Sequence, residues 1–286
     1  MPNASADISS VVAPPDSVPP GVRRHSRYRR LWRLARPVVM PLLVVFLIGV
    51  IWEAAVRGFA IPGYLLPPPS EIYTQTMAMG GVMWGHTLST LQTTMLGFAV
   101  SLAVSFPLAV AITASPLAAN AIYPLLVVTQ SIPKVALAPI LVVAFGANEL
   151  SRVLVAFLVA FFPLVISIAT GLLVLPPELI ELGRSLKATR LQELVRLRLP
   201  FAVPFVFSGL KLSMTFSVIG AVVGEFVAAE RGLGYQILTA TAFFKTAVAF
   251  GAVIILSVLG IVLFQAVVLI ERVFFPWSVP EEQPRP

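Results

Sequence analysis

Hydrophobic residues fill six long runs of this chain, and short polar segments separate the runs. Their ranges are 38–58, 87–113, 118–145, 151–175, 201–228 and 247–270. A helix needs about 20 predominantly apolar residues to cross the hydrocarbon core of a bilayer, and each run reaches that length. The pattern therefore predicts an all-α, polytopic membrane protein with six transmembrane helices.

The polar segments indicate the orientation and the domain boundaries. Residues 21–37 carry seven Arg and residues 176–200 carry five basic residues, whereas the alternate loops hold few. Basic loops stay on the cytosolic side of a membrane, so we expect both segments and both termini there. We expect a disordered basic tail over residues 1–37, a transmembrane domain over 38–275 and a cytosolic tail over 276–286.

Composition narrows the possible functions. Hydrophobic residues make up 58% of the chain and charged residues 12%, against about 25% charged in soluble domains. The net charge is +7, and the basic residues cluster beside the apolar spans. This placement indicates that they set the membrane topology and contact anionic lipid rather than nucleic acid. The Arg cluster before residue 38 fits a topology signal better than a lipid-surface helix. The chain has no Cys and two His, so we expect no metal site.

Catalytic and nucleotide-binding motifs are absent from the sequence. We find no GxxxxGK[ST], HExxH or GxSxG pattern, so we expect no catalytic residue, no cofactor and no ATP binding by this route. An ion-coupled secondary transporter is an alternative, but inverted repeats would favour that class and no internal repeat is visible. A membrane enzyme is a further alternative, for which a polar catalytic cluster is missing.

The longest polar interruption, residues 178–204, is cationic and helix-forming. Its Leu residues recur at three-to-four spacing, which predicts two short amphipathic helices. Such a loop on the basic side of a membrane indicates a docking surface for a cytosolic partner. Leu182 and Leu186 lie four residues apart as an apolar anchor, and Glu181 and Arg184 share a neighbouring face. The alternative is that both leucines pack against the chain's own spans.

The third hydrophobic run contains three prolines. Pro124, Pro133 and Pro139 each lack a backbone donor, and we expect an interruption at each of them. Within a membrane, freed carbonyls are tolerated where the backbone is buried in protein or lines a polar path. Gln130 and Lys134 flank Pro133, so these three residues are candidates for lining a translocation path.

Charged and small residues in the other runs supply further candidates. Ionisable side chains within spans default to functional hypotheses, and Glu225 is therefore a second candidate for the path. A structural role is the alternative for both Glu225 and Lys134. We expect Lys211 to extend its ammonium toward the membrane interface. Gly220 and Gly224 form a small-xxx-small pattern that would let two helices approach closely.

The docking loop also resembles a known motif. Glu181 and the pair Leu199 and Pro200 stand at the separation found in the EAA loop of binding-protein-dependent ABC importer permeases. Leu182 and Gly183 occupy the second and third places, where the family motif has Ala. The resemblance implies the type I ABC importer permease fold and a loop that fits a cleft on a cytosolic ATPase.

Lys187 occupies the place of the motif's Gly, which lies near the turn between the two loop helices in the family. If φ is positive there, Lys costs roughly 1 kcal/mol relative to Gly. The resemblance assigns the ATPase-coupling role to a set of loop residues. They are Glu181, Leu182, Gly183, Arg184, Leu186, Lys187, Leu199 and Pro200.

Three further segments resemble the nitrate/sulfonate/taurine branch of these permeases. They are YLLPPPSEI (64–72), QSIPKVALAPILVVAFG (130–146) and VVGEFVAAERGLGYQI (222–237), and the whole resemblance covers roughly residues 40–275. It implies a subunit of the bacterial plasma (inner) membrane that works with two cytosolic ATPase subunits and an extracytoplasmic solute-binding protein. One chain carries the full pattern, so we expect a permease homodimer. The implied solutes are sulfonates, taurine, nitrate and pyrimidine-type vitamin precursors.

Overall fold

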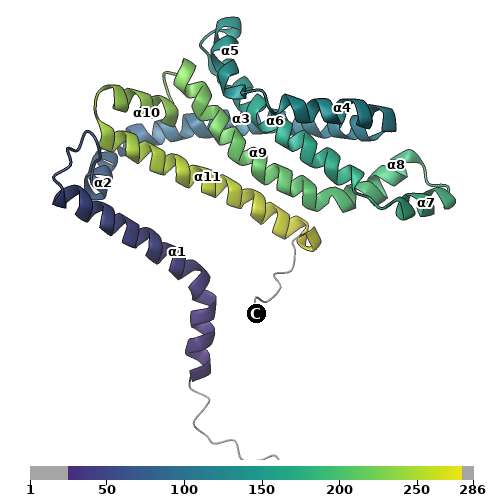
Figure 1. The fold of residues 1–286 in the computed structure, drawn as a ribbon, viewed down its shortest axis with the longest axis horizontal. Helices are drawn as coiled ribbons and strands as arrows, with labels where there is room; N and C mark the ends of the chain where they lie inside the picture. Colours follow the sequence, from purple (N-terminus) through teal and green to yellow (C-terminus); the bar gives the residue numbers. More distant parts are fainter. Residues whose placement is uncertain (1–24, 279–286) are drawn as a thin grey trace, which may run out of the picture. The chain divides into compact units, whose positions relative to one another are not determined.

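The computed structural model describes residues 25–278, and over this range every regular element is a helix (Figure 1). Residues 1–24 and 279–286 lie outside the described residues, and so do the parts of the two expected tails that fall there. The elements are α1 (His25–Gly58), α2 (Pro69–Ala78), α3 (Gly80–Thr113), α4 (Pro116–Thr129), η1 (Lys134–Leu137), α5 (Ala138–Phe145), α6 (Glu149–Leu173), α7 (Pro177–Ser185), α8 (Arg190–Glu193), η2 (Leu194–Arg198), α9 (Leu199–Ala228), α10 (Leu233–Ala242), α11 (Thr246–Phe274) and η3 (Pro276–Ser278).

The chain divides into two compact units, Met1–Ala55 and Val56–Pro286. The first unit holds most of α1. This helix begins at His25, so residues 25–37 are helical, whereas the sequence predicted a disordered tail there. Nearly all large apolar side chains over residues 39–55 are exposed, as expected of a helix that faces lipid.

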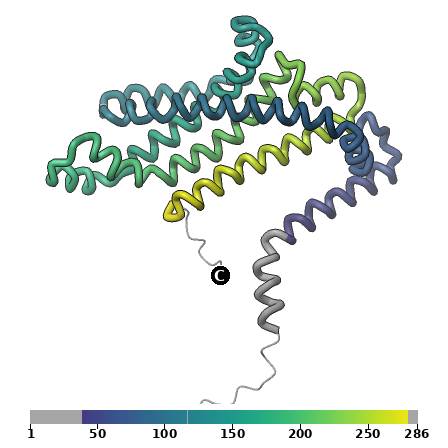
Figure 2. Tube along the Cα trace, turned by 180° about the vertical axis from the view of Figure 1, so that it is seen from behind, coloured from purple at the N-terminus to yellow at the C-terminus, as the bar shows by residue number. Residues whose placement is uncertain are grey.

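In the second unit α6 is the central helix, and α3 and α9 pack along it (Figure 1 and Figure 2). Leu164, Val165 and Ile168 of α6 are 0% exposed. They share one core with Ile112 of α3 and Ala202 of α9. A helix that is apolar on all sides is stable when other helices surround it, which accounts for the central place of α6.

Two glycines bring the backbone of α9 against that of α6. A Cβ atom on Gly220 would lie 2.7 Å from the Cα atom of Ala156, and one on Gly224 would lie 3.0 Å from the Cα atom of Arg152. Lipid-embedded helices associate through close van der Waals packing, which small residues permit. The two glycines, four residues apart, therefore lie at the contact between α9 and α6.

Buried serines add hydrogen bonds between the same helices. Ser213 Oγ of α9 donates to the carbonyl oxygen of Ala160 at 2.9 Å, and Ser105 Oγ of α3 donates to that of Phe161 at 3.3 Å. Each such bond between membrane helices contributes about 0.6 kcal/mol. The serines thus fix α3 and α9 to neighbouring positions on α6.

Five helices are long and apolar enough to cross a membrane, or six if the pair Leu117–Thr129 and Lys134–Phe145 counts as one span bent by 79°. The predicted all-helical membrane fold is confirmed. The break in the third span falls at residues 130–133. The interruptions predicted at Pro124 and Pro139 are wrong, because α4 continues through Pro124 and Pro139 lies in the first turn of α5. In a first turn the backbone N–H has no intrahelical partner to lose.

Two short helices, α2 and α10, lie in segments that were expected to be outer loops. The start of α2 carries a sequence signal, because Pro69 stands at its first position and Glu71 lies in its first turn. Thr76 of α2 contacts Gly251 of α11 so closely that a Cβ on that glycine would overlap its hydroxyl. The short helices are therefore packed parts of the second unit.

The close contact of α9 with α6 predicts a sharp effect of one methyl group. Gly220→Ala should lower the free energy of unfolding by about 1–3 kcal/mol, because the backbone of α6 must move to admit the Cβ. Gly260→Ala in α11 is the matched control, since no atom lies within 4 Å of that Cβ position. Thermal unfolding of the detergent-solubilised protein measures both changes. Equal midpoints for the two variants would contradict the contact.

Candidate functional site

The basic loop, residues 176–200, folds as α7, a tight turn, α8 and the π turn η2. Pro177 is the first residue of α7, where its missing N–H costs nothing, and Glu178 lies in the first turn beside the helix dipole. Thr189 and Gln192 form a reciprocal capping box at the start of α8. Each loop helix therefore carries a local signal for its start.

The turn between these helices places Lys187 at φ +56°. The Lys187 N–H donates to the carbonyl of Arg184 and the Ala188 N–H donates to that of Gly183, both at 2.9 Å. These two bonds define a Schellman motif, whose left-handed position is usually Gly. Lys187 thus takes the conformation for which the family motif has Gly, at a cost of roughly 1 kcal/mol.

An ion pair fastens the loop to the helical bundle. Arg198 donates from Nε and Nη2 to Glu193 Oε1 at 2.8 and 2.6 Å, and from Nη1 to the carbonyl of Leu172 at 3.3 Å. Gly183 is buried, and a Cβ there would lie 3.1 Å from Leu197 Cδ1. The loop therefore rests against its own second half and against the end of α6.

The apolar anchor of the loop lies at the surface. Leu182 is 56% exposed and Leu186 is 75% exposed. Glu181 and Arg184 beside them are exposed as well. The two leucines therefore do not pack within the chain's own spans, which was the alternative to a docking role.

The candidate path residues at the bend lie close together. Lys134 Nζ donates to the carbonyl oxygen of Gln130 at 3.0 Å, directly across Pro133. The same ammonium lies 5.0 Å from the ring centroid of Phe162 in α6. A carbonyl freed by the break thus accepts from a cation, and a cation–π contact holds that cation against the central helix.

Glu225 has a different setting. Its side chain is 1% exposed, and its oxygens accept from Thr90 Oγ1 of α3 and from the N–H of Gly234, each at 2.8 Å. Gly232 and Gly234 leave no room for a Cβ beside this carboxylate. In this structure the carboxylate is enclosed at the start of α10 and lines no open cavity.

The start of α10 is capped by side chains from distant parts of the chain. The Leu233 N–H donates to Thr90 Oγ1 at 2.8 Å, and the Gly232 N–H donates to His86 Nδ1 at 3.0 Å. With Glu225, these groups satisfy backbone donors that a helix start leaves without partners. The roles of His86 and Thr90 were not predicted from the sequence. Their spacing of four puts them on one face of α3, but the predicted span began at residue 87 and left His86 in the preceding loop.

Lys211 also lies elsewhere than expected. Its Nζ forms an ion pair with Glu271 Oε2 of α11 at 2.5 Å, and Glu271 accepts from Ser278 Oγ at 3.3 Å. The ammonium therefore does not extend freely to the interface. It joins α9 to the last membrane helix.

The described residues form a bundle of membrane-spanning helices with one bent span and a protruding basic loop. The chain matches the family described as the binding-protein-dependent transport system inner membrane component over residues 103–276, which is more than half of its length, and it belongs to this family. Members work with ATPase subunits and binding proteins. The protein is therefore a non-catalytic permease subunit of an ABC importer, as the sequence predicted.

Several permeases are similar along nearly the whole chain. Identity is 35% over 238 residues to the formylaminopyrimidine transport permease protein ThiX of Halalkalibacterium halodurans, covering 83% of this chain and 95% of that one. Identity is also 35% over 269 residues to the riboflavin transport system permease protein RibX of Chloroflexus aurantiacus, covering 93% and 97%. The taurine transport system permease protein TauC of Escherichia coli is 26% identical over 261 residues, covering 88% and 95%.

The fold is also similar to a solved structure. A chain of the MetNI methionine ABC transporter, in inward-facing conformations, matches with a TM-score of 0.60 at 19% identity. The match covers 68% of this chain and 97% of that chain. This likeness supports the permease fold.

The left-handed turn predicts how residue 187 responds to substitution. Lys187→Gly should leave the loop as stable or stabilise it by up to about 1 kcal/mol, whereas Lys187→Val should destabilise it by more than about 1 kcal/mol, because a β-branched residue is strained at this φ. Hydrogen exchange of the amides at residues 186–188 measures the effect. Ser185→Val, at an ordinary helical position of α7, is the control. A smaller effect at Lys187 than at Ser185 would contradict the strain.

Proposed function

We propose that the basic loop couples this permease to a cytosolic ATPase, with Leu182 and Leu186 as the apolar anchor. Exposure of these two leucines is the observation that carries the proposal. A few apolar anchors in a central pocket usually dominate such interfaces, while charges at the rim set the orientation. Glu181 and Arg184 have the rim role. The complete coupling set comprises Glu181, Leu182, Gly183, Arg184, Leu186, Lys187, Leu199 and Pro200.

The connection of the loop to the bundle supports this coupling. Arg190–Ala228 is one helical stretch of 39 residues, made of α8, η2 and α9. Arg198 links its beginning to Leu172 at the end of α6. A displacement of the loop by ATPase closure is therefore passed to α9 and α6, and the cavity of the transporter alternates between inward- and outward-facing forms.

We infer that both termini and the basic loop lie in the cytosol, with α2 and α10 on the outer side. The charge distribution supports this orientation, because residues 176–200 carry five basic residues. The domain organisation is a basic tail over residues 1–37, a transmembrane domain over 38–275 and a C-terminal tail over 276–286. The membrane is the plasma (inner) membrane of a bacterium.

The translocation path is proposed to run past the bend, along Gln130, Pro133 and Lys134. These residues combine a broken backbone with a cation, which membrane proteins tolerate beside polar paths. For Glu225 we propose a structural role as the cap of α10. We propose that a second copy of this chain completes the path, because one chain carries the full permease pattern.

The solute is proposed to be a small polar molecule that a binding protein delivers. The relatives named above carry formylaminopyrimidine, riboflavin and taurine, and others are named for aliphatic sulfonates and nitrate. We favour a nitrogen heterocycle of the pyrimidine or flavin kind, because the relatives named for such solutes are 35% identical and the taurine permease is 26% identical.

The docking proposal predicts that Leu186→Asp abolishes association with the ATPase and solute uptake. A carboxylate forced into an apolar pocket without a partner costs several kcal/mol. Pull-down of the ATPase by the membrane-inserted, monodisperse variant measures the association. Leu65→Asp is the matched control, since Leu65 is 63% exposed in the segment between α1 and α2 and should not affect the pull-down. Full ATPase retention by Leu186→Asp would refute the docking role.

The orientation predicts that two engineered cysteines react from opposite sides of the membrane. The chain has no native Cys, so Ser185→Cys in α7 and Ser70→Cys in α2 each introduce a single thiol. Both positions are exposed. An impermeant maleimide added to intact cells should label residue 70 and not residue 185. Labelling of both from the same side would exclude the six-span orientation.

A further inference from the structure

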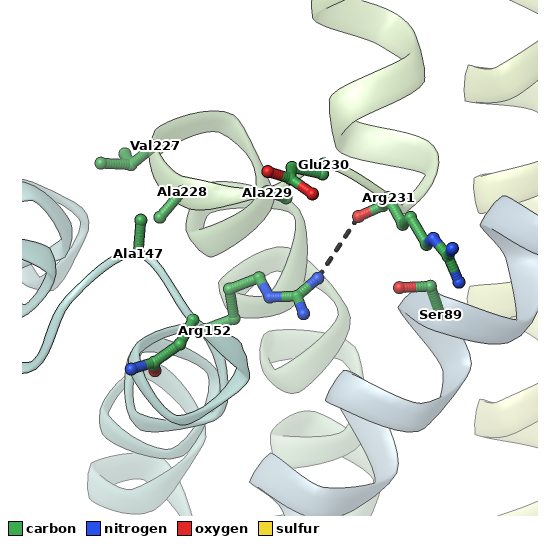
Figure 3. Close-up of a pocket in the computed structure, with 9 residues that line it drawn as sticks. Ser89, Ala147, Arg152, Val227, Ala228, Ala229, Glu230 and Arg231 are labelled. Carbon is green, nitrogen blue, oxygen red and sulfur yellow. Dashed lines mark hydrogen bonds between the residues drawn. The ribbon is translucent and has the colours of Figure 1, made fainter.

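A polar cavity of about 340 Å³ lies at the end of α9 opposite the basic loop (Figure 1), and Figure 3 shows its lining. It is open on one side and is lined by the beginning of α6 and the residues just before it, by the end of α9 and the turn before α10, and by Ser89 of α3. Arg152 and Arg231 are part of its wall. A second cavity of about 420 Å³ also has Ser89 and both arginines in its lining.

The donors of these arginines are mostly unused. Arg152 Nη1 donates to the carbonyl oxygen of Arg231 at 3.3 Å, while its Nε is buried without a partner (Figure 3). Within residues 25–278 the guanidinium of Arg231 has neither a hydrogen bond nor an ion pair. A guanidinium offers five N–H donors in a planar fork. The pair thus presents two positive charges, with one buried N–H of Arg152 that has no partner and an exposed guanidinium on Arg231.

Three carboxylates lie near the two arginines, but none forms an ion pair with either of them within residues 25–278. Glu225 attracts Arg152 electrostatically, although its own oxygens accept from Thr90 and Gly234, as described above. Glu149 accepts from Gln92 Nε2 at 2.7 Å. Glu230 lines the cavity, but no ion pair within 4.0 Å joins it to either arginine in the described part of the chain.

The scaffold fixes the backbone at both arginines. Gly224 lets α9 approach so closely that a Cβ would lie 3.0 Å from the Cα atom of Arg152. Arg231 immediately precedes Gly232, whose N–H is bound by His86 Nδ1. A site whose parts are fixed before binding loses less entropy when its ligand arrives.

We propose that Arg152 and Arg231 bind an anionic oxygen group, a carboxylate or a sulfonate, at the outer face. Paired N–H donors of guanidinium match the two oxygens of such a group and make charge-assisted hydrogen bonds. The group belongs to an acidic side chain of the solute-binding protein or, if the solute is a sulfonate or carboxylate in place of the heterocycle favoured above, to the solute itself. The proposal rests on the proposed function, because the outer position of the cavity follows from the orientation given there.

The first test uses methanesulfonate as a free anion with the assembled permease–ATPase complex in detergent. Methanesulfonate should raise the unfolding temperature of the wild-type complex more than chloride at equal ionic strength, and Arg231→Gln should abolish the difference. The Arg231 side chain has no internal partner, so this variant should fold normally. Arg272→Gln, which removes one exposed positive charge from the last turn of α11, is the matched control and should behave as wild type.

The second test measures import into proteoliposomes against the concentration of the loaded binding protein. Arg231→Gln should raise the half-maximal concentration by about tenfold, the change expected for losing one charge-assisted contact. Glu230→Gln should lower it, because a competing negative charge is removed. Arg152→Lys should also raise the half-maximal concentration, since Lys keeps the positive charge but lacks the planar fork.

Binding of the solute-free binding protein to the complex distinguishes the two sources of the anion. If Arg231→Gln weakens binding of the binding protein equally with and without solute, the anion is an acidic side chain of the binding protein. If it weakens binding only when solute is present, the anion belongs to the solute. The proposal is overturned if methanesulfonate gives no specific shift and both binding curves of Arg231→Gln stay within about twofold of wild type. Failure of the proposed function would differ, because the wild-type complex itself would then import nothing.

Discussion

Close approach of α9 to α6 is the contact on which the rest of the structure depends. Glycines at 220 and 224 let two backbones meet where larger side chains would keep them apart. In a bilayer, lipid tails are as apolar as leucine, so helices are held together by packing and hydrogen bonds rather than by exclusion from water. This contact positions the basic loop at one end of α9 and the cap of α10 at the other.

The sequence predicted the membrane spans and the loop well, because both depend on local patterns. Length and hydropathy define a span regardless of its neighbours, and the helix starts of the loop are marked by Pro177 and by the capping box at Thr189. The left-handed turn at Lys187 could be predicted because the family motif has Gly at this position. The backbone there has a positive φ although the side chain is Lys.

Tertiary partners account for what the sequence did not reveal. Pro124 lies within α4, which continues past it, so the predicted interruption does not occur there. The break in this span occurs at residues 130–133. Glu225 and Lys211 were judged as isolated charges within spans, yet each has a partner from a distant segment, Thr90 and Glu271. The partner of a buried charge is chosen by the packing of helices, and a single sequence contains no direct record of that packing.

The length of the stretch Arg190–Ala228 has a consequence for where the loop stands. At 1.5 Å per residue, 39 helical residues have a contour of about 58 Å, whereas the hydrocarbon core of a bilayer is about 30 Å thick. Even with substantial tilt, this helix outreaches the lipid tails by several turns. Its polar first turns can therefore lie beyond the headgroups, so that the ATPase proposed above could reach the leucines of the adjoining α7 without touching the membrane surface.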